Sequence, residues 1–170
     1  MAPSQLPLPS ESTIVSPNDF MREALKLAED GVHSGRGGPF GCVIVRRGVI
    51  VGRGQNAVAS TNDPTAHAEI VAIRDAGRTL GTFQLADCEL YTSCEPCPMC
   101  LAAIYWARIP QVFYGNTRAD AATIGFDDEF IYQQIPLPPE QRRLAMTPLL
   151  RAEAQAAFQA WVAKPDKVQY

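Results

Sequence analysis

The sequence predicts an α/β fold in which a β-sheet lies between helices. Runs of β-branched residues alternate along the chain with segments of helical periodicity, which is the pattern of layered α/β domains. The 170 residues, 46% of them hydrophobic, suffice for one substantial core. We therefore expect a single domain over residues 17–170, preceded by a flexible, proline-containing extension over residues 1–16.

Local signals define the expected elements. Ser16 and Pro17 have the residue types of an N-cap and a first helical turn, β-branched runs on either side of Gly48 suit a tight hairpin, and Gly81 is placed to end a helix. In order, the sequence predicts a helix over residues 17–34, strands over 41–45 and 49–52, a polar loop over 55–65, a helix over 66–81, a strand over 88–92, a helix over 97–107, a strand over 111–114 and an amphipathic helix over 149–162.

The composition argues against several classes of function. The net charge is −3, so the chain lacks the broad basic surface on which binding of nucleic acids normally depends. The N-terminal residues lack the basic residues and the apolar core of a signal peptide, and no apolar run is long enough to span a bilayer. We expect a cytoplasmic protein that uses neither a membrane nor a nucleic acid as its partner.

The five cysteines predict metal chemistry in preference to disulfides. Their number is odd, and Cys94, Cys97 and Cys100 fall within seven residues, a spacing that in an intracellular chain is typical of metal binding or catalysis. The chain has only two histidines, His33 and His67. A metal site that uses imidazole therefore has few candidate ligands.

Two short motifs combine into a candidate zinc site. His67 and Glu69 lie at the start of one predicted helix, in TAHAE, and Cys97 and Cys100 lie at the start of another, in PCPMC. Residues three apart on a helix share a face, and a helix N-terminus favours the thiolate form of cysteine. Three ligands, His67, Cys97 and Cys100, would leave the fourth position of one Zn²⁺ open for water, which is the catalytic arrangement. Glu69 is then placed to act as general acid and base.

A structural zinc site is the alternative interpretation of the same residues. A CxxC pair alone is common, and Cys94 is available as a fourth ligand. We favour the catalytic interpretation because Cys94 precedes a proline at a strand end, where its side chain is expected to pack beneath the site. Cys42 and Cys88 lie in predicted strands and are expected to be small buried hydrophobic residues, and His33 is expected to cap a helix or lie on the surface.

The combination of HAE with PCxxC, separated by a helix and a strand, resembles the cytidine deaminase superfamily over residues 17–117. This resemblance implies a three-layer α-β-α sandwich with a mixed, five-stranded sheet. DPTAHAEI and EPCPMC are similar to motifs of both the tRNA adenosine deaminases and the small bacterial guanine deaminases. The central motifs therefore leave the substrate open.

The resemblance to the small bacterial guanine deaminases extends to the last residue, through TSCEPCPMC, AIYWAR, VFYGN, GFDDEFIY and FQAW. It implies hydrolytic deamination of guanine, a small purine base, to xanthine and ammonia, with hydroxide generated at the zinc attacking C2. It also implies a homodimer in which residues 149–170 cross to the partner subunit. The alternatives are a tRNA adenosine deaminase, a deaminase of a related base such as cytosine or of an aminotriazine such as ammeline, and a non-catalytic module held together by zinc.

The same resemblance implies roles for individual residues. Glu69 would move the proton of the attacking hydroxide, and Asp128, or its neighbour Asp127, would deliver a proton to the departing nitrogen. The residues expected to contact the purine are Asn56, the backbone of Ala68, Phe40, Trp106 and the partner subunit's Tyr170. Each has an ordinary interpretation as well, because asparagine favours loops, acidic residues favour helix starts and aromatic residues fill cores.

Overall fold

The computed structural model describes residues 16–169. Apart from Ser16, the N-terminal extension expected over residues 1–16 lies outside the described residues. The first helix, α1 (Pro17–His33), begins as the sequence predicts. The backbone N–H and the hydroxyl of Ser16 both donate to the carboxylate of Asp19, at 2.9 and 2.7 Å, so a capping box starts the helix.

Four strands form one mixed sheet in the order β2-β1-β3-β4. β1 (Gly41–Arg46) pairs antiparallel with both β2 (Val49–Gln55) and β3 (Cys88–Cys94), and β3 pairs parallel with β4 (Gln111–Asn116). The expected mixed α/β sandwich is confirmed, but the prediction of a fifth strand is wrong for the described residues.

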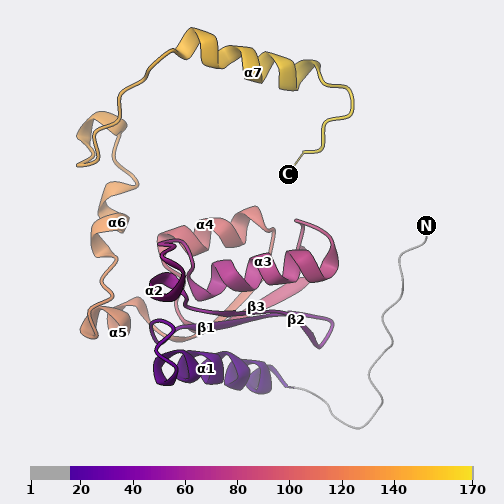
Figure 1. Ribbon diagram of the computed structural model, residues 1–170, viewed down its shortest axis with the longest axis vertical. Helices are drawn as coiled ribbons and strands as arrows, with labels where there is room; N and C mark the ends of the chain where they lie inside the picture. Colours follow the sequence, from indigo (N-terminus) through magenta and orange to yellow (C-terminus); the bar gives the residue numbers. More distant parts are fainter. Residues whose placement is uncertain (1–15, 170) are drawn as a thin grey trace.

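The sheet ends at β4 because the chain then turns into helices. α5 (Arg118–Thr123) and α6 (Glu129–Gln134) follow β4 directly, and a 3-10 helix, η1 (Pro139–Gln141), comes after them. Pro136, Pro138 and Pro139 lie in this stretch, and proline cannot donate a hydrogen bond to a neighbouring strand. The extended residues beyond η1 then run away from the sheet (Figure 1).

Helices cover both faces of the sheet, as Figure 1 shows. α1 packs on one face, and α3 (Ala68–Leu80) and α4 (Pro98–Trp106) pack on the other. Because side chains alternate along a strand, Ile44 of β1 faces α3 and α4, whereas Val43 and Val45 face α1. A short helix, α2 (Val58–Thr61), lies within the loop expected over residues 55–65.

Glycines in β2 let the start of α3 lie directly against the sheet. A Cβ atom added to Gly54 would meet the carbonyl oxygen of Ala68 at 1.9 Å, and one added to Gly52 would meet that of Ala72 at 2.5 Å. A side chain at either position would therefore push α3 outward. This close approach fixes the first turn of α3, where two of the candidate site residues lie.

The C-terminal arm, defined here as residues 129–169, extends away from the sandwich (Figure 1). Its last helix, α7 (Arg151–Ala163), makes no extensive contact with another described helix or strand. The arm exposes many large apolar side chains: Phe130, Ile131, Ile135, Leu144, Met146, Leu149, Leu150, Phe158, Trp161, Val162 and Val168. Over residues 16–169, none of the helices combines the length and the apolar character needed to cross a membrane.

Candidate active site and metal centre

The candidate zinc ligands meet where α3 and α4 begin. His67 is the N-cap of α3 and Cys97 is the N-cap of α4, both with extended backbone, and Cys100 lies in the first turn of α4. The candidate ligand atoms of these three residues all lie within 4.8 Å of one another. His67 Nδ1 is 3.5 Å from Cys97 Sγ. Residues from two motifs 30 positions apart are thus brought together at one end of the sheet.

This geometry and donor set fit zinc. A tetrahedral ion with ordinary zinc–sulfur and zinc–nitrogen bonds separates a thiolate from an imidazole nitrogen by roughly 3.5 Å. A hydrogen bond from Cys100, together with the nearby His67 imidazole, holds the pKa of the Cys97 thiol well below its ordinary value. The thiolate that zinc requires is therefore favoured at this position.

Cys94 does not join the three ligands. Its buried Sγ lies 3.6 Å from the carbonyl oxygen of Thr117, and among residues 16–169 the only cluster suited to a metal contains His67, Cys97 and Cys100. A three-ligand set leaves one tetrahedral position free, which is the catalytic and not the structural pattern. Cys42 and Cys88 are buried in strands as expected, and His33 is exposed at the end of α1.

Glu69 is buried beside the ligands, with 6% of its surface exposed. Burial raises the pKa of its carboxyl group above the ordinary range of glutamate. Thr92 Oγ1, on β3, donates a hydrogen bond to Glu69 Oε1 at 3.0 Å. A buried carboxyl group with a raised pKa is suited to take up a proton and to release it again. Sequence reasoning missed Thr92 because a threonine in a strand has an ordinary explanation as a β-former.

Asn56 is buried at the end of β2, and its amide is oriented by the backbone around it. Its Oδ1 accepts hydrogen bonds from the N–H groups of Gly38, at 3.2 Å, and Val58, at 3.4 Å. No described residue accepts a hydrogen bond from Nδ2. The Oδ1 atom of Asn56 is thus hydrogen-bonded to the backbone, and the Nδ2 amino group is the part of the amide that can donate to a ligand.

An aromatic pair joins two distant loops near Asn56. The ring of Phe40 meets that of Phe126 edge to face, with 4.9 Å between centroids and an interplanar angle of 89°. Phe126 also approaches Gly38, where an added Cβ would lie 3.1 Å from its ring. Phe126 was not singled out from the sequence, although it belongs to the GFDD motif that carries Asp127 and Asp128.

The two acidic residues after Phe126 differ in environment. Asp127 is exposed, and its Oδ1 accepts a hydrogen bond from the backbone N–H of Glu129 at 2.9 Å, just before α6, whose N-cap is Asp128. Asp128 is half-buried, and desolvation raises its pKa while the charge of Arg118 opposes that change. The charge of Cys97 also acts on Asp128. Of the two carboxyl groups, Asp128 is thus the less exposed.

Comparison with known proteins identifies the family. Residues 15–116 match the family described as the cytidine and deoxycytidylate deaminase zinc-binding region. The guanine deaminase of Bacillus subtilis is 54% identical over 151 residues, a match that covers 89% of this chain and 97% of that protein. The chain belongs to the guanine deaminase family.

The similarity to this family includes the arm. The crystal structure of the Bacillus subtilis guanine deaminase superposes with a TM-score of 0.88 and 52% identity, covering 91% of this chain and 99% of that chain. A tRNA-specific adenosine deaminase of Streptococcus pyogenes is 48% identical over only 96 residues, which are 56% of this chain and 60% of that protein. The similarity to guanine deaminase therefore extends over much more of the chain.

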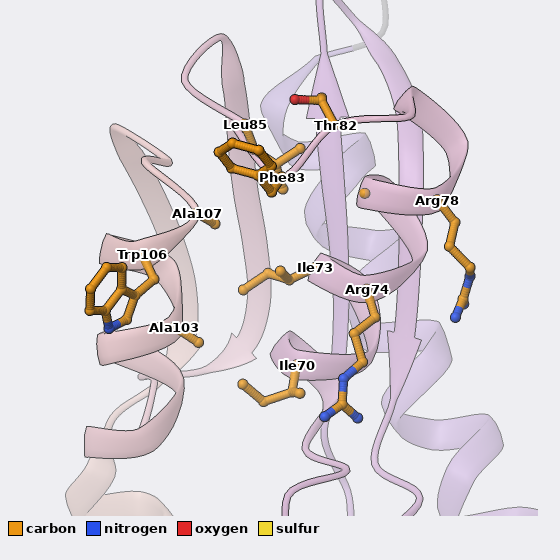
Figure 2. Close-up of a pocket in the computed structure, with 11 residues that line it drawn as sticks. Ile70, Ile73, Arg74, Arg78, Thr82, Phe83, Leu85, Ala103, Trp106 and Ala107 are labelled. Carbon is orange, nitrogen blue, oxygen red and sulfur yellow. The ribbon is translucent and has the colours of Figure 1, made fainter. Parts of the chain in front are cut away.

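Trp106 lies apart from the metal ligands. It is 62% exposed at the end of α4 and lines an apolar groove of about 930 Å³ between α3 and α4. Figure 2 shows it across this groove from Ile70 and Ile73. None of the three candidate zinc ligands lines the groove. The expected contact of Trp106 with the purine stays a prediction. Ala68 is buried next to His67, and Tyr170 lies outside the described residues.

Proposed function

We propose that this guanine deaminase family member hydrolyses guanine to xanthine and ammonia, as a cytoplasmic enzyme of purine catabolism. The observation that carries the proposal is the burial of the Glu69 carboxyl group beside a three-ligand zinc cluster in a chain that is similar to a guanine deaminase over 89% of its length. His67, Cys97 and Cys100 would hold the Zn²⁺, which would supply activation of a water molecule at neutral pH.

Glu69 is the proton carrier for the attack. Its carboxylate accepts a proton from the attacking water and passes it to the purine, and the hydrogen bond from Thr92 sets the direction in which the carboxylate faces. The raised pKa supports this role, because a carboxyl group that ionises closer to neutral pH returns its proton more readily. The net reaction adds one water, breaks the C2–N bond and releases ammonia.

Asn56, Ala68 and Phe40 are the proposed contacts to the base. The free amino end of Asn56 is suited to donate to an acceptor, and guanine offers O6 and N7. The backbone of Ala68 adds a polar contact at the start of α3. The Phe40–Phe126 pair supplies an apolar surface for the flat ring system.

Asp128 is the proposed source of the proton that the departing nitrogen needs. Its half-buried position supports this assignment over Asp127, which is exposed and accepts a hydrogen bond from the backbone N–H of Glu129. A carboxyl group whose pKa is raised by desolvation keeps a proton to higher pH and can donate it.

The functional unit is proposed to be a homodimer in which each subunit's C-terminal segment crosses to the other. The exposed apolar side chains of the arm and the apolar groove between α3 and α4 support association with a second copy, because large exposed apolar surfaces mark sites of protein–protein association. Tyr170 of the partner subunit would then close the site. Light scattering should give twice the mass of the 18.5 kDa chain, and a monomeric mass with full activity would refute this arrangement.

Deamination of adenosine in tRNA is the second candidate, because the Streptococcus pyogenes enzyme is similar over 96 residues. The net charge of −3 counts against a polyanionic partner.

A panel of substrates tests the proposal. Zinc-loaded protein is incubated with guanine, adenine, cytosine, ammeline and a tRNA anticodon stem, and release of ammonia is measured together with the product. We expect xanthine from guanine as the dominant product. Turnover of another substrate without turnover of guanine would reject the proposal.

A further inference from the structure

Arg118 lies between the metal-binding loop and the start of the C-terminal arm. Its backbone N–H donates to Glu95 Oε2 at 3.0 Å, and Glu95 directly precedes the PCPMC motif that provides two zinc ligands. The preceding residue, Thr117, caps α5 through a reciprocal pair of hydrogen bonds with Asp120. The main chain at Arg118 is thus fixed relative to the metal centre.

The side chain of Arg118 reaches forward to the first turn of α6. Its Nη2 forms an ion pair with Glu129 Oε2, and its guanidinium carbon lies 4.1 Å from the centre of the Tyr132 ring. Glu129 and Tyr132 are three positions apart, so they share a face of the helix. A planar guanidinium can stack on a ring while it donates to a carboxylate, which an ammonium group cannot do equally well.

Asp128 lies directly beside this contact in the first turn of α6. It immediately precedes Glu129, and its carbonyl oxygen accepts hydrogen bonds from Ile131 at 2.9 Å and from Tyr132 at 3.3 Å. Movement of the first turn of α6 would therefore move the Asp128 backbone with it. The charge of Arg118 also acts on the Asp128 carboxyl group.

We propose that Arg118 is a positioning residue that holds Asp128 toward the metal centre by fastening the first turn of α6 to the loop before α4. The inference rests on the proposed function, because it assigns Asp128 the proton given to the departing nitrogen. It adds a residue outside the zinc motifs to the parts that the reaction needs. The alternative is an ordinary surface contact, since the side chains of Arg118 and Glu129 are 36% and 48% exposed.

The test compares Arg118→Met with a matched control, Arg22→Met. Like Arg118, Arg22 forms an ion pair, in this case with Asp19, which lies three residues earlier in the chain. Arg22 is on α1, which covers the face of the sheet opposite the metal ligands. Each variant is purified with zinc, and zinc content, melting temperature, kcat and KM for guanine are measured. We expect Arg118→Met to lower kcat on the order of tenfold with little change in KM, zinc content or melting temperature. Arg22→Met should match the wild type, and Arg118→Lys should recover part of the loss.

A double-mutant cycle separates positioning from a general effect on structure. In an Asp128→Asn background, assayed at high enzyme concentration, Arg118→Met should change kcat by less than about twofold, because the group on which it acts is gone. An unchanged kcat in Arg118→Met, or an equal loss with and without Asp128, would overturn the inference alone. A wild-type protein inactive on guanine would instead reject the proposed function and this inference with it.

Discussion

Thr92 Oγ1 donates to Glu69 Oε1 at 3.0 Å, and both side chains are buried between β3 and α3. Thr92→Val keeps the shape of the side chain but removes the donor. Hydrogen bonds to charged groups contribute about 1.5–3 kcal/mol, so we expect kcat to fall about 10-fold to 100-fold. Thr92→Ser, which keeps the hydroxyl, should retain most of the activity. Equal kcat values for the valine and serine variants would show that this bond does not orient Glu69.

Glu69→Gln distinguishes catalysis from a purely structural role of the metal. The amide retains the shape of the side chain and can still accept a hydrogen bond from Thr92, but it cannot carry a proton. We expect turnover to fall by about 10² to 10⁴, with zinc content and melting temperature close to the wild type. Zinc analysis and thermal unfolding on the same samples check this. If instead turnover persists in this variant, proton transfer must be assigned to another group.

Local sequence signals predicted the order of the elements around the zinc site but not the detail at helix starts. The helices expected to begin at residues 66 and 97 correspond to α3 and α4, which begin at Ala68 and Pro98. His67 and Cys97 are N-caps with extended backbone. Neither histidine nor cysteine is a usual capping residue type, so the sequence carries no signal that marks these two residues as the helix boundaries. The later helix starts matter chemically, because the extended backbone of His67 and Cys97 lets these two candidate ligands approach each other.

The features that the sequence pattern did not predict concern how distant segments of the chain lie relative to one another. The last helix was expected over residues 149–162 and is found at Arg151–Ala163, yet nothing in its own pattern indicates that it lies away from the sheet. Trp106 lies at the end of α4, and the helical spacing of α4 does not by itself place its ring in the groove beside α3. Such placements depend on contacts between distant segments, and periodicity records only the local geometry.

Removal of the metal should affect both activity and stability. The ion would join the starts of α3 and α4, so a chelator is expected to abolish turnover and lower the melting temperature, with both restored by added zinc. Cys97→Ser should lose the stoichiometric zinc. Cys94→Ala should keep one zinc per chain, because Cys94 lies outside the ligand cluster. Loss of zinc from the Cys94 variant would instead indicate a four-ligand structural site.

Asn56→Asp tests the orientation of the Asn56 amide. An aspartate can accept the same two backbone hydrogen bonds from Gly38 and Val58, so the fold should be kept, but it has no N–H to donate. We expect KM for guanine to rise by about tenfold or more, because a donor is replaced by a negative charge facing a purine acceptor. Steady-state kinetics and thermal unfolding measure the two effects. An unchanged KM would mean that the amino end of Asn56 does not contact the base.

Stability at alkaline pH should depend on Cys88, which begins β3 at the end opposite the metal-binding loop. Burial, followed by the charge of Asp87, raises the pKa of this thiol from 9.0 to about 11. Between these values the unfolded chain loses the proton and the folded chain keeps it, so the contribution of this thiol is complete below pH 9 and disappears as the pH rises through about 11. The free energy of unfolding should therefore fall less steeply with pH in Cys88→Ala than in the wild type. Urea unfolding from pH 8 to 11 measures both slopes, and parallel slopes would contradict the assignment.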